Sequence, residues 1–156
     1  MGIPRSLYAH IERQLHNRDY AAVAEASRDV VNLREDAVNL KSPALSAGGK
    51  SSMPGDRVQE NVTRVIEAEE RLSRAIRWQM VFLKLDEAFA GMPEGEVAQL
   101  LYRDKATSQQ IANLRRCDRQ TVRRLRDTYV THAALLAAEA GLIRMRQYMD
   151  RGGDSE

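Results

Sequence analysis

The sequence predicts an all-α protein, and three observations support that class. Ala, Leu, Val, Arg and Glu dominate the 156 residues and only 5% of the chain is aromatic, a composition that favours helices over strands. Apolar residues recur at three- and four-residue steps over long segments. No stretch alternates apolar and polar residues for long enough to form a half-buried strand. We therefore expect a long helical hairpin followed by a carboxy-terminal domain of shorter helices.

The amino-terminal segment, residues 1–40, is expected to be helical from about residue 5, with a break near Asn17. Apolar residues repeat there at an interval of eleven, which favours a nearly straight packing stripe. Its members are Ile11, Leu15, Ala22, Ala26, Leu33 and Ala37. Because half of them are alanines, the stripe allows close packing against a partner but contributes little burial of its own.

Residues 41–56 are expected to form a flexible linker, since they contain two prolines, three glycines and four serines. The segment Gly48-Gly49-Lys50-Ser51 superficially resembles a phosphate-binding loop. The first glycine of that motif is missing, because Ala44 stands in its place, and no strand precedes it. Nucleotide binding is therefore not expected here.

A long helix is predicted from residue 57 to about residue 90, with Asp56 as its N-cap, Gly91 as its left-handed cap and Pro93 in the first turn of the next helix. Its apolar residues follow a heptad-like pattern: Val58, Val62, Val65, Leu72, Ile76 and Leu83. Such a stripe must pack on the first helix, on a second copy of the chain or on both, and homodimerisation is the preferred outcome. Trp78 and Phe82 are expected to be core or dimer contacts.

Residues 91–148 are predicted to form a helix-turn-helix domain with an extended last helix, and residues 149–156 a disordered tail. A short helix over 93–103 carries Val97, Leu100 and Leu101. Thr107 caps a helix over 108–114, residues 115–117 form a turn, and Asp118 caps a second helix that continues to Ile143. The shared core of the two helices is expected to hold Ile111, Ala112, Cys117, Val122 and Leu125.

Positive charge is concentrated in this domain. Residues 1–102 carry 13 basic and 15 acidic side chains, whereas residues 103–127 carry eight basic and three acidic ones. Within twelve residues there are six arginines: Arg115, Arg116, Arg119, Arg123, Arg124 and Arg126. Few acids lie nearby in the sequence, since Asp118 serves as a cap and Asp127 can pair with one arginine. A local basic cluster of this kind is typical of a nucleic-acid-binding surface.

The segment SQQIANLRRCDRQTVRRLRDTYV, residues 108–130, resembles the helix-turn-helix of region 4 of sigma factors. It departs from the pattern at Arg116, where glycine is common, and at Arg115, where an apolar residue is usual. We expect Leu114 to compensate for Arg115, and a slightly longer turn to leave Arg116 right-handed. The layout of the whole chain is similar to that of phage late-gene activators of the RinA and ArpU families. The similarity lies in the two long helices, the linker between them and the MPGDRVQ segment at 53–59.

This resemblance implies a sequence-specific regulator of phage genes whose partners are double-stranded DNA and host RNA polymerase. A cytoplasmic location is expected because the sequence shows neither a signal peptide nor a membrane span. In a helix-turn-helix, residues at the start of the second helix enter the major groove and flanking residues face phosphates. We therefore expect base contacts from Arg119, Gln120, Thr121 and Arg123. Phosphate contacts are expected from Lys105, Thr107, Ser108, Arg115, Arg116, Arg124 and Arg126.

Enzymatic activity is not expected, because the chain shows no nucleophile–base pair at a suggestive spacing. No cofactor or metal site is predicted, since His10, His16 and His132 are scattered and Cys117 is the single cysteine. No segment has the length of a membrane span. Two alternatives remain open: a small terminase-like DNA-packaging subunit, which also joins a helix-turn-helix to long helices, and a helical interaction protein that binds no DNA.

Overall fold

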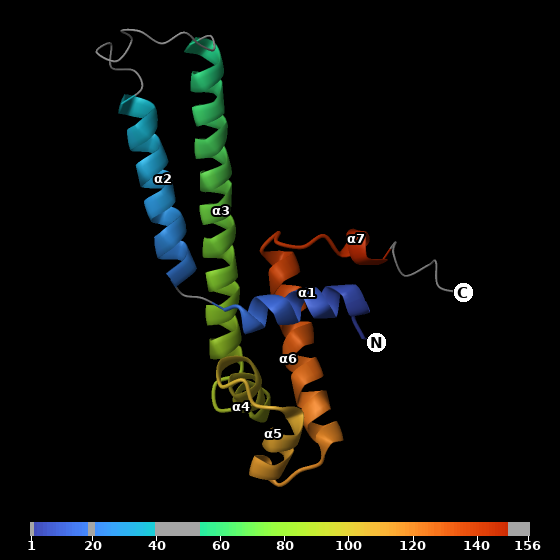
Figure 1. Cartoon of the computed structure of the whole chain (residues 1–156). Helices are drawn as coiled ribbons and strands as arrows, with labels where there is room; N and C mark the ends of the chain where they lie inside the picture. Colours follow the sequence, from blue (N-terminus) through green and yellow to red (C-terminus); the bar gives the residue numbers. More distant parts are fainter. Residues whose placement is uncertain (1, 19–20, 40–53, 150–156) are drawn as a thin grey trace. The chain divides into compact units, whose positions relative to one another are not determined.

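The computed structural model describes residues 2–18, 21–39 and 54–149 (Figure 1). Every regular element within these ranges is helical, so the predicted all-α class is confirmed for them. None of these helices is long and apolar enough to cross a membrane. The elements are, in order, α1 (Arg5–His16), α2 (Ala21–Asn39), α3 (Pro54–Ala88), α4 (Pro93–Ala98), the π-helix η2 (Gln99–Arg103), α5 (Ser108–Arg115), α6 (Arg119–Glu139) and α7 (Met145–Met149).

These helices divide into two compact units. Of the described residues, 2–18 and 77–149 form unit 1, and 21–39 and 54–76 form unit 2. The division falls within α3, so that one continuous helix contributes to both units. The amino-terminal segment predicted as one piece also contributes to both, because α1 belongs to unit 1 and α2 to unit 2.

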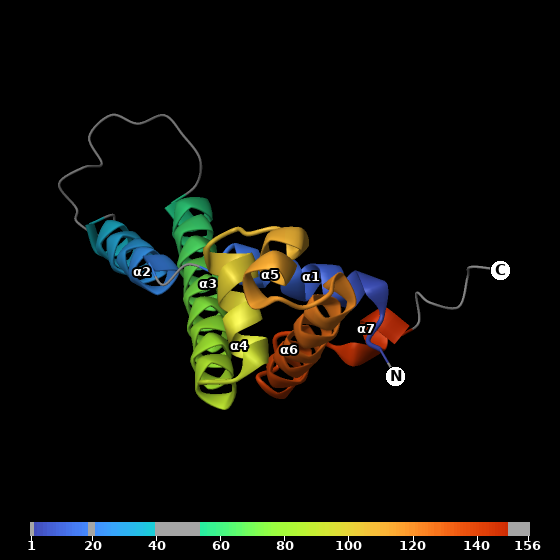
Figure 2. The same cartoon turned by 90° about the horizontal axis from the view of Figure 1, so that it is seen from below.

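In unit 1, α1 packs against α6 and η2 (Figure 2). Its inner face consists of Leu7, Ile11 and Leu15, which recur every four residues and are no more than 2% exposed. The helix ends at His16 with Asn17 as its C-cap, so the break that the sequence predicts near Asn17 is confirmed. The eleven-residue stripe does not form one surface, because its first two members are buried in unit 1 while the other four are half-buried in unit 2.

Polar contacts also hold α1 on α6, through a group that we call the Arg126 cluster: Tyr8, Glu12, Tyr102, Arg126 and Asp127. Nε of Arg126 donates to the Tyr8 hydroxyl (2.8 Å) and lies 3.1 Å from a Glu12 carboxylate oxygen. The Tyr8 hydroxyl in turn donates to Asp127 (2.7 Å), and the Tyr102 hydroxyl donates to Glu12 (2.9 Å). Burial raises the pKa of Tyr8 to about 12, and burial with the Glu12 charge raises the pKa of Tyr102.

The long helix α3 begins at Pro54, so Asp56 lies within its first turn and the prediction of Asp56 as the N-cap is wrong. Proline suits a first helical turn, because its missing N–H has no intrahelical partner there. Pro93 opens α4 as predicted, and Gly91 has the predicted left-handed conformation with φ of +72°, but α3 ends three residues before it, at Ala88. Gly95 is required in α4 because a Cβ there would lie 2.4 Å from the Phe89 carbonyl oxygen.

The carboxy-terminal part of α3 supplies large side chains to the core of unit 1. Trp78, Val81, Phe82 and Leu85 are buried there, so the predicted core positions of Trp78 and Phe82 are confirmed. The predicted heptad-like stripe follows a different side of the helix. Its members Val58, Val62, Ile76 and Leu83 are 45–50% exposed, and Val65 and Leu72 are half-buried.

Helix α6 ends at Glu139, before the Ile143 predicted from its periodicity. Gly141 follows with φ of +74°, and the Leu142 N–H donates to the Ala137 carbonyl (2.9 Å). A left-handed residue after a helix, together with a hydrogen bond from the next N–H to the carbonyl five residues earlier, is a Schellman motif, which ends the helix. The chain then turns, and Ile143 is buried outside the helix.

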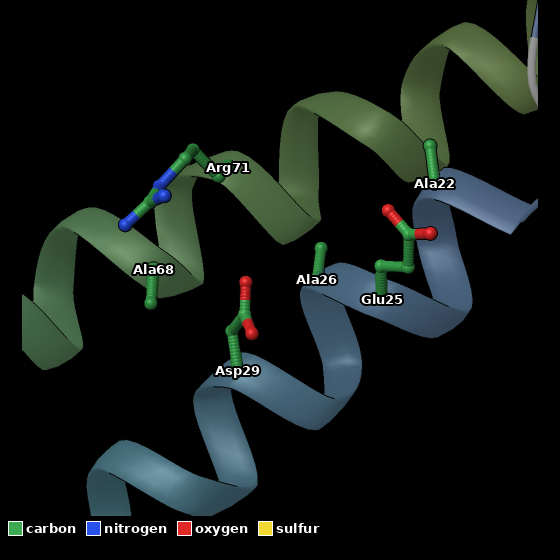
Figure 3. Close-up of a pocket in the computed structure, with 6 residues that line it drawn as sticks. All are labelled: Ala22, Glu25, Ala26, Asp29, Ala68 and Arg71. Atoms are coloured by element: carbon green, nitrogen blue, oxygen red, sulfur yellow. The ribbon is translucent and has the colours of Figure 1, made fainter.

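Unit 2 consists of α2 and the antiparallel amino-terminal part of α3 (Figure 1). Val30 and Ala68 are the buried hydrophobic side chains of its described residues. A shallow groove lies between the helices and is lined by Ala22, Glu25, Ala26, Asp29, Ala68 and Arg71 (Figure 3). An ion pair between Arg34 and Glu69 joins the two helices.

The predicted linker lies outside the described residues except for 54–56, as does the predicted tail except for Met149.

We predict that Tyr8→Phe destabilises unit 1 by about 1–3 kcal/mol in chemical denaturation, because it leaves Arg126 and Asp127 without the hydroxyl that joins them. Tyr148→Phe is the matched control, since its hydroxyl forms no hydrogen bond among the described residues. Equal stabilities for the two variants would contradict a structural role for the Arg126 cluster.

Candidate nucleic-acid interface

The basic segment of the sequence folds into α5 and α6, which pack against each other in unit 1. Ile111, Ala112 and Val122 are at most 3% exposed, and Cys117 and Leu125 are half-buried against the same core. These five residues are the ones expected from the spacing of the sequence. The contact fixes the direction of α6 relative to α5, and it leaves the polar sides of both helices in solvent.

The start of α5 is closed by a capping box. The Gln110 N–H donates to the Thr107 hydroxyl (3.2 Å), and the Thr107 N–H donates to the Gln110 side chain (2.9 Å). Two N–H groups that have no partner within the helix are thereby satisfied. The prediction of Thr107 as an N-cap is confirmed.

The turn between α5 and α6 is closed by Arg116, whose φ of +54° and ψ of +44° are left-handed. The Cys117 N–H donates to the Ala112 carbonyl (3.0 Å), and the Arg116 N–H to the Asn113 carbonyl (3.4 Å). This is the same Schellman pattern that ends α6 at Gly141. The expectation of a right-handed Arg116 is therefore wrong, because the short turn requires the conformation that glycine usually adopts.

Arg115 replaces the apolar residue usual in such turns, and the structure gives it a different partner from the one expected. Its guanidinium forms an ion pair with Glu96 of α4. Leu114 is 70% exposed, so the expectation that it compensates by packing inward is wrong. The stem of Arg115 lies partly buried at this position, and its charge is balanced by a helix that precedes the segment.

The amino terminus of α6 is capped by Asp118, as predicted. Its carboxylate accepts a hydrogen bond from the Thr121 N–H (2.7 Å). The hydrogen bonds from Thr121, with a smaller contribution from the Arg124 charge, lower the pKa of Asp118 below 3.8. The carboxylate is therefore ionised at neutral pH, where it stabilises the positive end of the helix.

All four predicted base-contacting residues are exposed at the start of α6: Arg119, Gln120, Thr121 and Arg123. At ~100° per residue, Arg119, Gln120 and Arg123 share one side of the helix, and Thr121 lies further round. Among the described residues, no ion pair or side-chain hydrogen bond engages the guanidinium groups of Arg116, Arg119, Arg123 or Arg124. We call these four residues the free arginines.

The residues predicted to contact phosphate fall into three groups: those without a charged partner among the described residues, Lys105 with a backbone partner, and two arginines in ion pairs. Arg116 and Arg124 are exposed, Thr107 is exposed and Ser108 is half-buried at the start of α5. Lys105 is exposed and left-handed, and its ammonium donates to the His16 carbonyl (2.7 Å). Arg115 and Arg126 are half-buried in ion pairs with Glu96 and Glu12.

Sequence reasoning missed the two acids that neutralise part of the basic segment. Glu12 lies more than 100 residues before Arg126, and Glu96 lies 19 residues before Arg115. A count of acids within the segment cannot find them, because packing brings them from α1 and α4. The hydrogen bond with Tyr8 and the Glu12 charge outweigh the effect of burial and raise the pKa of Arg126, so this arginine stays charged within the protein.

No group of His, Cys, Asp and Glu with a geometry suited to a metal ion occurs among the described residues. Burial lowers the pKa of His10 and of His16, and the Lys105 charge adds to the effect at His16. No protein-family model matches the chain, and no curated protein or solved structure matches it either. The case for a function therefore depends on the residues and their geometry.

We predict that Arg116→Gly is more stable than Arg116→Ala by about 1 kcal/mol, because alanine retains the left-handed strain that glycine relieves. Both changes remove the same charge, so the difference reports the backbone alone. The free energy of unfolding from urea titrations is the measurement. If alanine equals or exceeds glycine, the turn does not require a left-handed residue.

A second prediction concerns the Asp118 cap. Its pKa is lowered by folding, so its stabilisation is present above the ordinary value of 3.8 and is lost as the pH falls through the folded value. The wild type should have a higher Tm than Asp118→Ala at pH 7, and this difference should shrink on acidification. Asp118→Asn should retain a pH-independent part of the advantage, because the amide oxygen also caps. A pH-independent difference between the wild type and Asp118→Ala would contradict an ionised cap.

Proposed function

We propose that this protein is a sequence-specific DNA-binding transcriptional regulator, in which α5 and α6 form a helix-turn-helix and the start of α6 enters the major groove. The observation that carries the proposal is the set of free arginines at the turn and the start of α6. They are exposed and lack carboxylate partners among the described residues. Desolvated arginines without acceptors are costly in a protein contact, whereas phosphates and guanine edges supply acceptors.

The proposed roles follow from position on α6. Arg119, Gln120 and Arg123 share the exposed side of its first two turns, where a recognition helix contacts base edges. Thr121 is proposed to reach a thymine methyl group. Arg116 and Arg124 flank this side and are proposed to bind phosphates, together with Lys105 and the capped start of α5 at Thr107 and Ser108.

Arg115 and Arg126 were expected to bind phosphates, and that expectation stays untested. Each already has a carboxylate partner, Glu96 and Glu12 respectively. A phosphate contact would require these arginines to leave or share those partners. We therefore propose a function that does not depend on either residue. We assign them instead to holding α4 and α1 in place beside the basic helices.

The proposed partner is double-stranded DNA, bound by a homodimer so that two copies of α6 reach two half-sites. Regulation of phage genes in the cytoplasm and contact with host RNA polymerase are further parts of the proposal, and they rest on the sequence resemblance. A small terminase subunit would also bind DNA, but as a ring of many copies, so the mass in solution separates the two functions.

DNA binding is tested first by salt dependence with a selected duplex. The proposed phosphate contacts of Lys105, Arg116 and Arg124 number three per copy and six per dimer, which implies that affinity falls about 1,000-fold between about 50 and 200 mM salt. Fluorescence anisotropy with purified protein measures this slope. If no duplex pool shows binding at about 50 mM salt, the proposed function is wrong.

The division between base and phosphate roles is tested with single arginines. Arg123→Ala should cost about 1–3 kcal/mol on the preferred site and relax the preference at one base pair. Arg124→Ala should weaken all sequences about equally and reduce the salt slope by about 1 per copy, or about 2 for the dimer. Arg144→Ala, an exposed arginine outside the free arginines, is the control and should change neither quantity. Identical behaviour of Arg123→Ala and Arg124→Ala would contradict the assigned roles.

A further inference from the structure

Helix α2 carries exposed aliphatic side chains on one side. Val31 and Val38 are 51% and 69% exposed. They lie seven residues apart, so two helical turns bring them onto the same side of the helix. Arg34 lies three residues after the first and four before the second, and it therefore shares this side.

Helix α3 carries a corresponding row within unit 2. Val62, Ile66 and Ile76 are 45–50% exposed, and steps of four and ten residues place them on one side of the helix. Glu69 lies three residues after Ile66 and seven before Ile76, so it shares the same side. Val58, also half exposed, extends the row by one turn.

The ion pair between Arg34 and Glu69 shows that the two rows meet on one face of unit 2. We call this surface the valine face: Val31, Arg34, Val38, Val58, Val62, Ile66, Glu69 and Ile76. The groove between α2 and α3 lies on the other side of the pair, because Asp29 is five residues before Arg34 and Arg71 is two after Glu69. That side carries charged groove residues, as Figure 3 shows.

Unit 2 has little core of its own. Among residues 21–38 and 57–76, the buried hydrophobic side chains are Val30 and Ala68. Two helices of this length that bury so little apolar surface need a further layer for stable packing. The valine face presents six aliphatic residues from which such a layer can be built.

We propose that the valine face binds the valine face of a second copy of this chain, so that α2 and α3 of both copies form a four-helix bundle. This inference deepens the proposed homodimer by naming its surface. The face extends over about 30 Å by 20 Å, from ~1.5 Å per residue and ~10 Å per helix. A flat face of these dimensions has an area on the order of 600 Å² per copy. Protruding side chains add to this area, so it is close to the ~800 Å² per partner of a standard interface.

Charge favours a second copy over an unlike partner. The valine face contains one cation, Arg34, and one anion, Glu69, and the exposed Glu35, four residues after Val31, lies at its edge. Because both signs are present, the face does not favour a strongly acidic or a strongly basic partner. About a two-fold axis, the same residues meet in reciprocal pairs. Arg34 of one copy then approaches Glu69 of the second, and four charges alternate in sign across the interface.

The first test is the mass of the full chain in solution without DNA, by sedimentation equilibrium. The wild type should have twice the 17.6 kDa chain mass. Ile66→Glu should raise the dissociation constant of the dimer at least about tenfold, because it places an unpaired charge in an apolar interface. Leu135→Glu, the same kind of change at a 56% exposed residue of α6, is the control and should remain dimeric. A monomeric wild type at about 50 μM, a ring of many copies, or dissociation by the control alone overturns the inference.

The second test uses charge and does not depend on how Ile66→Glu folds. Arg34→Glu leaves two acids on the valine face, and Glu69→Arg leaves two bases. Each variant alone should dimerise at least about tenfold more weakly than the wild type, and an equimolar mixture should form a one-to-one heterodimer. Mixing cannot restore a contact that stays within one chain. If the mixture associates no better than the separate variants, the reciprocal arrangement is wrong.

These outcomes are separable from the DNA-binding proposal. A dimerisation variant that keeps its helical content in circular dichroism should still bind a single half-site, with the salt slope of one copy. Loss of the dimer with retained half-site binding supports both proposals. A wild-type monomer that binds DNA overturns the valine-face inference and leaves the function standing.

Discussion

The docking of α1 on α6 is the constraint on which the geometry of unit 1 depends. The inner side of α6 is rich in alanine, since Ala133, Ala134 and Ala137 are fully buried. Alanines let neighbouring helices approach closely, but they bury little apolar surface, so the larger side chains must come from elsewhere. Leu7, Ile11 and Leu15 of α1 supply them, and the Arg126 cluster adds hydrogen bonds and a charge pair at the edge of this contact.

This contact also determines where positive charge remains available. Arg126 lies two turns into α6, and Glu12 and Tyr8 of α1 satisfy it there. Arg119 and Arg123 belong to the same helix but precede the region that α1 covers, and they remain exposed. One helix therefore has a neutralised middle and a cationic start. Six clustered arginines in the sequence become four free arginines in the structure, and the positive potential is concentrated at one end of α6.

The sequence predicts local features of this fold well and long-range ones poorly. The caps at Thr107 and Asp118 and the left-handed conformation of Gly91 follow from residue types that act within three or four positions. The separation of α1 from α2, and the pairing of Glu12 with Arg126, depend on packing between segments about 110 residues apart, which periodicity does not encode. The end of α6 differs from the prediction for another reason: Ile143 is apolar and in register with the helix, but Gly141, a weak point within that periodic pattern, is left-handed and follows the end of the helix at Glu139.

The conformation of Arg116 connects the fold to the proposed function. The chain closes α6 with the same hydrogen-bonding motif and uses Gly141 there, which fits the left-handed position without steric cost. At the end of α5 it uses arginine instead, at a cost of about 1 kcal/mol. Strain of this kind persists where the surrounding structure determines it, and it is concentrated at functional positions. Arg116 is exposed and belongs to the free arginines, so the strained residue adds a cation beside the start of α6. The nucleic-acid contact that we propose would account for this choice, because a phosphate contact at this turn gains from a guanidinium and nothing from glycine.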